Sequence, residues 1–140
     1  MVLTGATQHT GTTTVTEGTL SLQGGSVGVI PNVWIGNNAK LSADVASGNN
    51  RHDISGNLTL AGGTLGGNTN YSDTNAGQFF FSNAGQQIVV HGDTQSVISA
   101  ETHYSGTHTI NVADGASAVD LLVTGKLSHQ HLVAWGGITK

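Results

Sequence analysis

The chain has 140 residues, a formal net charge of −4 and no cysteine, and 36% of its residues are hydrophobic while only 9% are charged. The length suits a single domain covering residues 1–140, and the hydrophobic content excludes an intrinsically disordered chain. Four basic residues are too few for nucleic-acid binding, no apolar run reaches the roughly 20 residues of a membrane-spanning helix, and the lack of cysteine excludes a disulfide framework.

Short runs rich in β-branched residues, bounded by Gly, Asn or Asp, predict about a dozen β-strands. Two alanine-bearing stretches, residues 38–46 and 113–122, are the credible helices. Residues 66–78 have no apolar periodicity and predict a surface loop. The fold is therefore expected to be all-β, with strands at residues 2–4, 12–16, 19–22, 27–30, 33–35, 57–60, 79–81, 87–90, 96–99, 108–112, 121–124 and 126–133.

An internal repeat is the most informative feature of the sequence. Residues 17–28 read E-G-T-L-S-L-Q-G-G-S-V-G, and residues 55–66 read S-G-N-L-T-L-A-G-G-T-L-G. Alternation places the leucines on one face of a strand, and the Gly pair lets the chain turn a corner. If the distance from one copy to the next is two turns, the chain forms a β-solenoid of roughly seven turns. Four leucines are then buried and stacked on the same inner face: Leu20, Leu22, Leu58 and Leu60.

Two segments resemble a known family. Residues 3–22 read L-T-G-A-T-Q-H-T-G-T-T-T-V-T-E-G-T-L-S-L, and residues 135–140 read W-G-G-I-T-K. The first resembles the autotransporter-associated β-strand repeat of bacterial autotransporter passenger domains, and the second resembles the segment that precedes such a repeat. The resemblance implies an exported, right-handed parallel β-helix without enzymatic activity that serves as a stalk or adhesive surface. It does not extend to residues 66–110, where a sandwich-like insertion is the alternative, as a β-sandwich is for the whole fold.

Sequence patterns that suggest catalysis have a simpler structural explanation. Residues 24–28 fit G-x-S-x-G, but a nucleophile elbow needs a strand-to-helix turn in a large α/β sheet, and this segment belongs to the repeat. The carboxylates are scattered, as expected of solvated turn residues. We therefore expect no enzyme and no catalytic residue, although a glycosidase-like pair could be built from Asp44 with Asp53 or from Asp114 with Asp120.

Seven histidines are an excess for this length, and they raise the question of a metal site. His129 and His131 share one face of a strand, and a neighbouring turn could add His103 or His108 as a ligand for Zn or Cu. No carboxylate lies near His129 and His131 in the sequence to support such ligands. The expectation is therefore that the protein needs no metal and no cofactor.

Aromatic residues suggest a carbohydrate ligand as a different class of function. Tyr71 and Tyr104 could stack on sugar rings if they are exposed, whereas Trp34 and Trp135 are expected to fill the core. A carbohydrate-binding or carbohydrate-cleaving β-helix is therefore one alternative function, with a carbohydrate or a host or biofilm surface as the partner.

The ends of a solenoid expose unpaired backbone N–H and C=O groups, and the strand pattern here runs close to both ends of the sequence. We therefore expect an extracellular or cell-surface structural protein whose copies pair head to tail into a surface or matrix fibre. The alternative is an excised passenger segment of an autotransporter-like adhesin. The expected assembly interface comprises Val2, Leu3, Thr4, Leu132, Val133 and Ile138.

Overall fold

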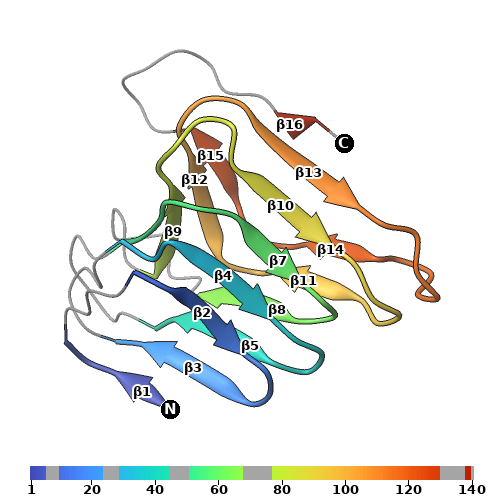
Figure 1. Cartoon of the computed structure of the whole chain (residues 1–140), viewed down its shortest axis with the longest axis horizontal. Coiled ribbons are helices and arrows are strands. Elements are labelled where there is room, and N and C mark those ends of the chain that lie inside the picture. The colour runs from blue at the N-terminus through green and yellow to red at the C-terminus, as the bar shows by residue number, and fades with distance from the viewer. Residues whose placement is uncertain (6–9, 24–28, 45–50, 68–76, 130–137, 140) are drawn as a thin grey trace.

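The computed structural model describes residues 1–5, 10–23, 29–44, 51–67, 77–129 and 138–139. These residues form sixteen short strands and no helix, so the all-β prediction is confirmed (Figure 1). In that part of the chain, accordingly, no helix has the length and apolar character needed to cross a membrane. The strands are β1 (Val2–Leu3), β2 (Thr12–Val15), β3 (Thr19–Leu22), β4 (Asn32–Ile35), β5 (Lys40–Ala43), β6 (His52–Ile54), β7 (Leu58–Leu60), β8 (Thr64–Gly67), β9 (Gln78–Phe81), β10 (Gln87–Val90), β11 (Ser96–Ile98), β12 (Glu101–Tyr104), β13 (His108–Val112), β14 (Leu121–Val123), β15 (Leu127–His129) and β16 (Ile138–Thr139).

The strands pair in parallel and form three sheets that wrap one core. Sheet A has the order β1-β3-β5-β8-β11-β14, sheet B has the order β2-β4-β7-β10-β13-β16, and sheet C has the order β6-β9-β12-β15. Successive strands pass from sheet B to sheet A, then to sheet C and back to sheet B, as in β7, β8, β9 and β10. The chain is therefore a β-solenoid in which six strands stack in sheet A and six in sheet B, with its N-terminus at one end of the stack and its C-terminus at the other (Figure 1).

The length of a turn differs from the prediction. One turn carries the chain from Thr12 to its partner Asn32, but a later turn, from Leu58 to its partner Ile88, is half as long again. The expected count of seven equal turns is therefore wrong. The two copies of the internal repeat also lie in different sheets, β3 in sheet A and β7 in sheet B. A strand with alternating Leu residues can belong to sheet A or to sheet B. The repeat therefore identifies a kind of strand, and its spacing does not give the length of a turn.

Two other predictions are corrected. The expected helix at residues 38–46 contains β5, and residues 113–120 are bends and irregular backbone that lead into β14. Strands β9 to β13 continue the three parallel sheets, so residues 77–110 are not a sandwich-like insertion. Of the expected loop at residues 66–78, Gly66, Gly67 and Gln78 belong to β8 and β9, and the residues between 67 and 77 lie outside the described part.

The core is built by alternation along each strand. Inward positions of sheet B hold Val33, Leu58 and Ile88, which are buried and lie side by side in register. Outward positions of the same sheet are polar or half-buried, such as Thr59 between Trp34 and Val89. Stacking one apolar residue per turn gives a continuous apolar column, which is how a solenoid with few charges can be stable.

The connections from sheet B to sheet A share one backbone conformation. Asn38 has φ 59° and Gly62 has φ 78°, and each lies in the connection between a sheet B strand and a sheet A strand. This left-handed conformation reverses the chain within a few residues, and Gly and Asn adopt it at the least cost. The corner thus explains why Gly and Asn interrupt the short strands.

Candidate functional site

At the N-terminal end of the solenoid, β1 is an open edge of sheet A. Within the described residues its only neighbour is β3, whose Ser21 and Gln23 N–H groups donate to the C=O groups of Met1 and Leu3 at 2.9 and 2.8 Å. Backbone groups of successive strand residues point in opposite directions. The N–H and C=O of Val2 therefore face away from β3, toward the open end.

At the C-terminal end, β14 is the corresponding open edge of sheet A. The Ser96 N–H donates to the Asp120 C=O at 2.8 Å, and the Thr124 N–H donates to the Ile98 C=O at 3.0 Å. By the same alternation, the N–H and C=O of Val123 point away from β11. In the described part, β15 and β16 also have a single neighbour each, β12 and β13.

Exposed apolar side chains collect on these two ends. The described residues include six exposed large hydrophobic side chains, with exposed fractions from 39% for Leu127 to 80% for Met1. Leu127 continues the inward row of Phe79 and Thr102, which are fully buried inside the stack. Val2 and Leu122 take outward positions of sheet A, in register with Ser21 and Val97. All six exposed side chains lie on the first or last turn: Met1, Val2 and Val29 at the N-terminal end, and Val119, Leu122 and Leu127 at the C-terminal end.

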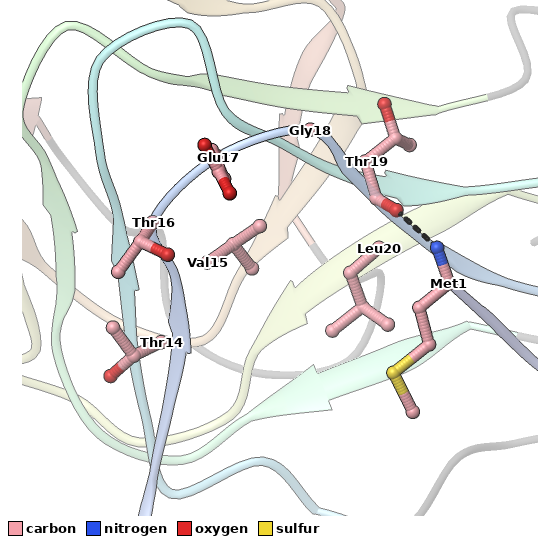
Figure 2. Close-up of a pocket in the computed structure, with 8 residues that line it drawn as sticks. All are labelled: Met1, Thr14, Val15, Thr16, Glu17, Gly18, Thr19 and Leu20. Carbon is pink, nitrogen blue, oxygen red and sulfur yellow. Dashed lines mark hydrogen bonds between the residues drawn. The ribbon is translucent and has the colours of Figure 1, made fainter.

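A hollow of about 560 Å³ opens at the N-terminal end, beside the edge strand β2. Figure 2 shows residues 14–19 bending around it, with Met1 beside Leu20 on one side. The Met1 ammonium group donates a hydrogen bond to the Thr19 C=O at 2.8 Å, which holds β1 against β3. The hollow thus lies next to backbone edges that have no neighbouring strand among the described residues.

The predicted interface residues fall on these edges where the structure describes them. Val2 and Leu3 form β1, Thr4 follows it, and Ile138 belongs to the edge strand β16. Leu132 and Val133 lie outside the described residues. The exposed residues Leu122 and Leu127 were missed, because a strand pattern does not show which strands lie at an edge.

The other predicted residues are placed as follows. Leu22, Leu58 and Leu60 are buried, and Leu20 is partly buried against the same core. The four do not stack on one inner face, as predicted, because β3 belongs to sheet A and β7 to sheet B. Tyr104 is 5% exposed, stacked on Phe81 at 5.2 Å between ring centroids, and hydrogen-bonded to Thr102. A sugar ring therefore has no access to Tyr104, and Tyr71 lies outside the described residues.

The outer face of sheet C carries a charged cluster that the sequence did not predict. The buried Glu101 carboxylate accepts a hydrogen bond from the Gln78 amide at 3.0 Å. His103 Nε2 and Lys126 Nζ lie 3.2 and 3.3 Å from its other oxygen. One turn away, the Arg51 guanidinium lies 4.0 Å from the centre of the Phe80 ring. Both carboxylate oxygens have partners from adjacent turns, which is the arrangement of a structural network.

The histidine and aspartate side chains considered as metal ligands or catalytic acids are engaged in hydrogen bonds or ion pairs within the protein. His108 Nε2 lies 3.0 Å from the Ser105 C=O, and burial lowers its pKa. Asp44 accepts hydrogen bonds from Ser21 and Ser42, each at 2.6 Å, while Asp53 pairs with Arg51. Across the described ranges, no three His, Asp or Glu side chains are grouped so that they could hold a metal ion. Residues 24–28 and His131 lie outside those ranges.

In comparisons with known proteins, no family model, no curated protein and no solved structure matches this chain. The fold is consistent with a β-helix repeat, which is the coarser part of the family resemblance. Membership of the autotransporter family has no support from these comparisons. The candidate site therefore rests on the geometry of the two ends alone.

Proposed function

We propose that this protein is a structural β-solenoid subunit, without enzymatic activity, whose copies join end to end by parallel strand pairing. One observation carries the proposal: the exposed large hydrophobic side chains of the described residues lie on the first and last turns, beside open strand edges. An open, apolar strand edge is a template for pairing with another chain. Joining two different ends is a heterologous contact, which produces a filament.

Charge does little to oppose this assembly. Only 9% of the residues are charged, and in the cluster around Glu101, on the outer face of sheet C, the Lys126 ammonium group is paired with the Glu101 carboxylate. Backbone pairing and apolar burial are barely screened by salt. The assembly is therefore expected to persist at high ionic strength.

The proposed setting is extracellular or on a cell surface. The sequence has no cysteine that an oxidising environment could damage, and its surface is rich in Thr, Ser, Asn and Gly. Such a fibre would serve as a matrix component or a stalk for adhesion. The second candidate is a segment of a longer adhesin, which the same open edges favour, since further turns of one polypeptide would cover them.

Replacing Val2 with proline tests the proposal. Proline removes the Val2 N–H, which points to the open end, and leaves the hydrogen bonds that β1 makes with β3. We expect Val2→Pro to abolish polymers in sedimentation velocity while circular dichroism still shows the folded monomer. Val2→Ala is the matched control, because it also shortens the exposed side chain but keeps the N–H group, so it should still form polymers where Val2→Pro does not.

Two results would count against the proposal. Wild-type protein that stays monomeric at high concentration would exclude self-assembly and leave the adhesin segment as the better explanation. Polymers of Val2→Pro as abundant as those of Val2→Ala would show that β1 takes no part in the contact.

A further inference from the structure

The order of the sheets around the coil fixes how two ends can meet. Each sheet B strand with a described successor is followed by a sheet A strand, from β2 and β3 through β13 and β14. The last described strand, β16, belongs to sheet B, and the first, β1, belongs to sheet A. The strand after β16 in the order of the sheets would therefore belong to sheet A. A second copy placed beyond β16 supplies such a strand, its β1.

We propose that copies dock in a single rotational phase, in which β1 of one copy pairs with β14 of the preceding copy and β16 of the preceding copy pairs with β2. This inference rests on the proposed end-to-end assembly and adds its geometry. Sheets A and B then run through the contact in the same order as within one chain. The partner is thus a second copy of this chain in one fixed orientation.

In this phase, β16 of one copy and β1 of the next lie on either side of one corner between sheets B and A. Inside the chain, the connection from a sheet B strand to the next sheet A strand can be short, as between Leu60 at the end of β7 and Thr64 at the start of β8. Across the contact, β1 of the next copy takes the place of the sheet A strand that follows a sheet B strand within the chain. The hollow beside β2 and Met1 lies where this corner would run, so the preceding copy's last strand would fill it.

The backbone directions agree with this pairing. Inside sheet A, the N–H of each later strand goes to the C=O of the residue before its partner: Ser21 pairs with Val2 and donates to the Met1 C=O. The row that contains Val2 and Ser21 continues through Ser42 and Gly66. Extended to β14 this row reaches Thr124, whose N–H follows the same rule by donating to the Ile98 C=O.

In the proposed phase, Val2 of the next copy therefore lies beside Thr124, and its N–H meets the C=O of Val123. Both of these groups face the open ends, as the hydrogen bonds of β1 and β14 show. Rotation of one copy to place β1 on β15 of sheet C would break the order of the sheets. It would also move Val2 beside the edge that carries Ser128.

Disulfide trapping tests the phase, because the chain has no cysteine of its own. Adjacent strands lie about 4.8 Å apart, within the Cα separations that a disulfide spans. We expect mild oxidation of the variant with Val2→Cys and Thr124→Cys to give a ladder of covalent oligomers on a non-reducing gel. The control carries Val2→Cys and Ser128→Cys, with its second cysteine on the sheet C edge, and should stay at least tenfold less cross-linked.

The outcomes separate this inference from the proposed function. If the reduced Val2→Cys, Thr124→Cys variant polymerises in sedimentation like the wild type but oxidation gives no ladder, the phase is wrong and end-to-end assembly stands. Equal ladders from both variants would likewise contradict a single phase. If the wild type does not polymerise, the proposed function fails, and the phase fails with it.

Discussion

Replacing Leu58 with alanine is expected to lower the free energy of unfolding by about 2 to 5 kcal/mol, because the substitution leaves a cavity in the centre of the core. Leu58 has no exposed surface and lies in β7 between Val33 of β4 and Ile88 of β10. Stacked turns above and below restrict collapse around the cavity. Urea unfolding followed by circular dichroism measures the change.

Val119→Ala is the matched control for this substitution. Val119 is exposed in the connection before β14, so its truncation should change the free energy of unfolding by about 0.5 kcal/mol or less. A Leu58→Ala variant as stable as Val119→Ala would contradict the placement of Leu58 on the inner face of sheet B.

Acidification is expected to destabilise the protein between pH 6.5 and pH 4 through His52. Burial lowers the pKa of His52 from 6.5 to about 4, an effect that the backbone of Leu22 partly offsets. The ring is fully buried against Phe79. Unfolded chains bind the proton below pH 6.5, but the folded protein does not until about pH 4. The free energy of unfolding therefore falls by on the order of 3 kcal/mol as the pH is lowered from 6.5 to about 4.

Urea unfolding at pH 7.5 and pH 4.5 measures this loss. Burial also lowers the pKa of His103 and His108, so part of the pH dependence should remain in His52→Leu. The exposed Val119 has no titratable group, and Val119→Ala should keep the full dependence of the wild type. If His52→Leu and the wild type lost the same stability on acidification, His52 would not be the buried neutral group that the structure places in the core.

The sequence predicted the strands whose inward positions are aliphatic. Residues 19–22 alternate Leu with Thr or Ser, residues 87–90 are rich in Ile and Val, and the two runs match β3 and β10. Strand β5 was mistaken for helix because Lys40–Ala43 is short and contains Ala. Two strands of sheet C, β6 and β12, were missed for a different reason. Their inward positions include His52 and Thr102, and their outward positions carry Asp53 and Glu101, so no aliphatic alternation marks them.

The candidate site was predicted in part. Val2 and Leu3 start the strand pattern, which is enough to suggest an edge strand near that end. The phase of the contact could not be predicted, because it depends on which sheet each end strand joins. The turn that starts at Leu58 is longer than the turn that starts at Thr12, and this irregularity removes the period from which that assignment could be counted.

Fibre diffraction from aligned wild-type protein tests the central claim most directly. In-phase assembly adds six strands per copy to sheets A and B. The pattern should therefore show a meridional reflection near 4.8 Å together with an axial repeat of about 29 Å, six strand spacings, from one copy to the next. Filaments with a different axial repeat, or a protein that remains dispersed as single subunits at the concentrations used to draw fibres, would contradict the account.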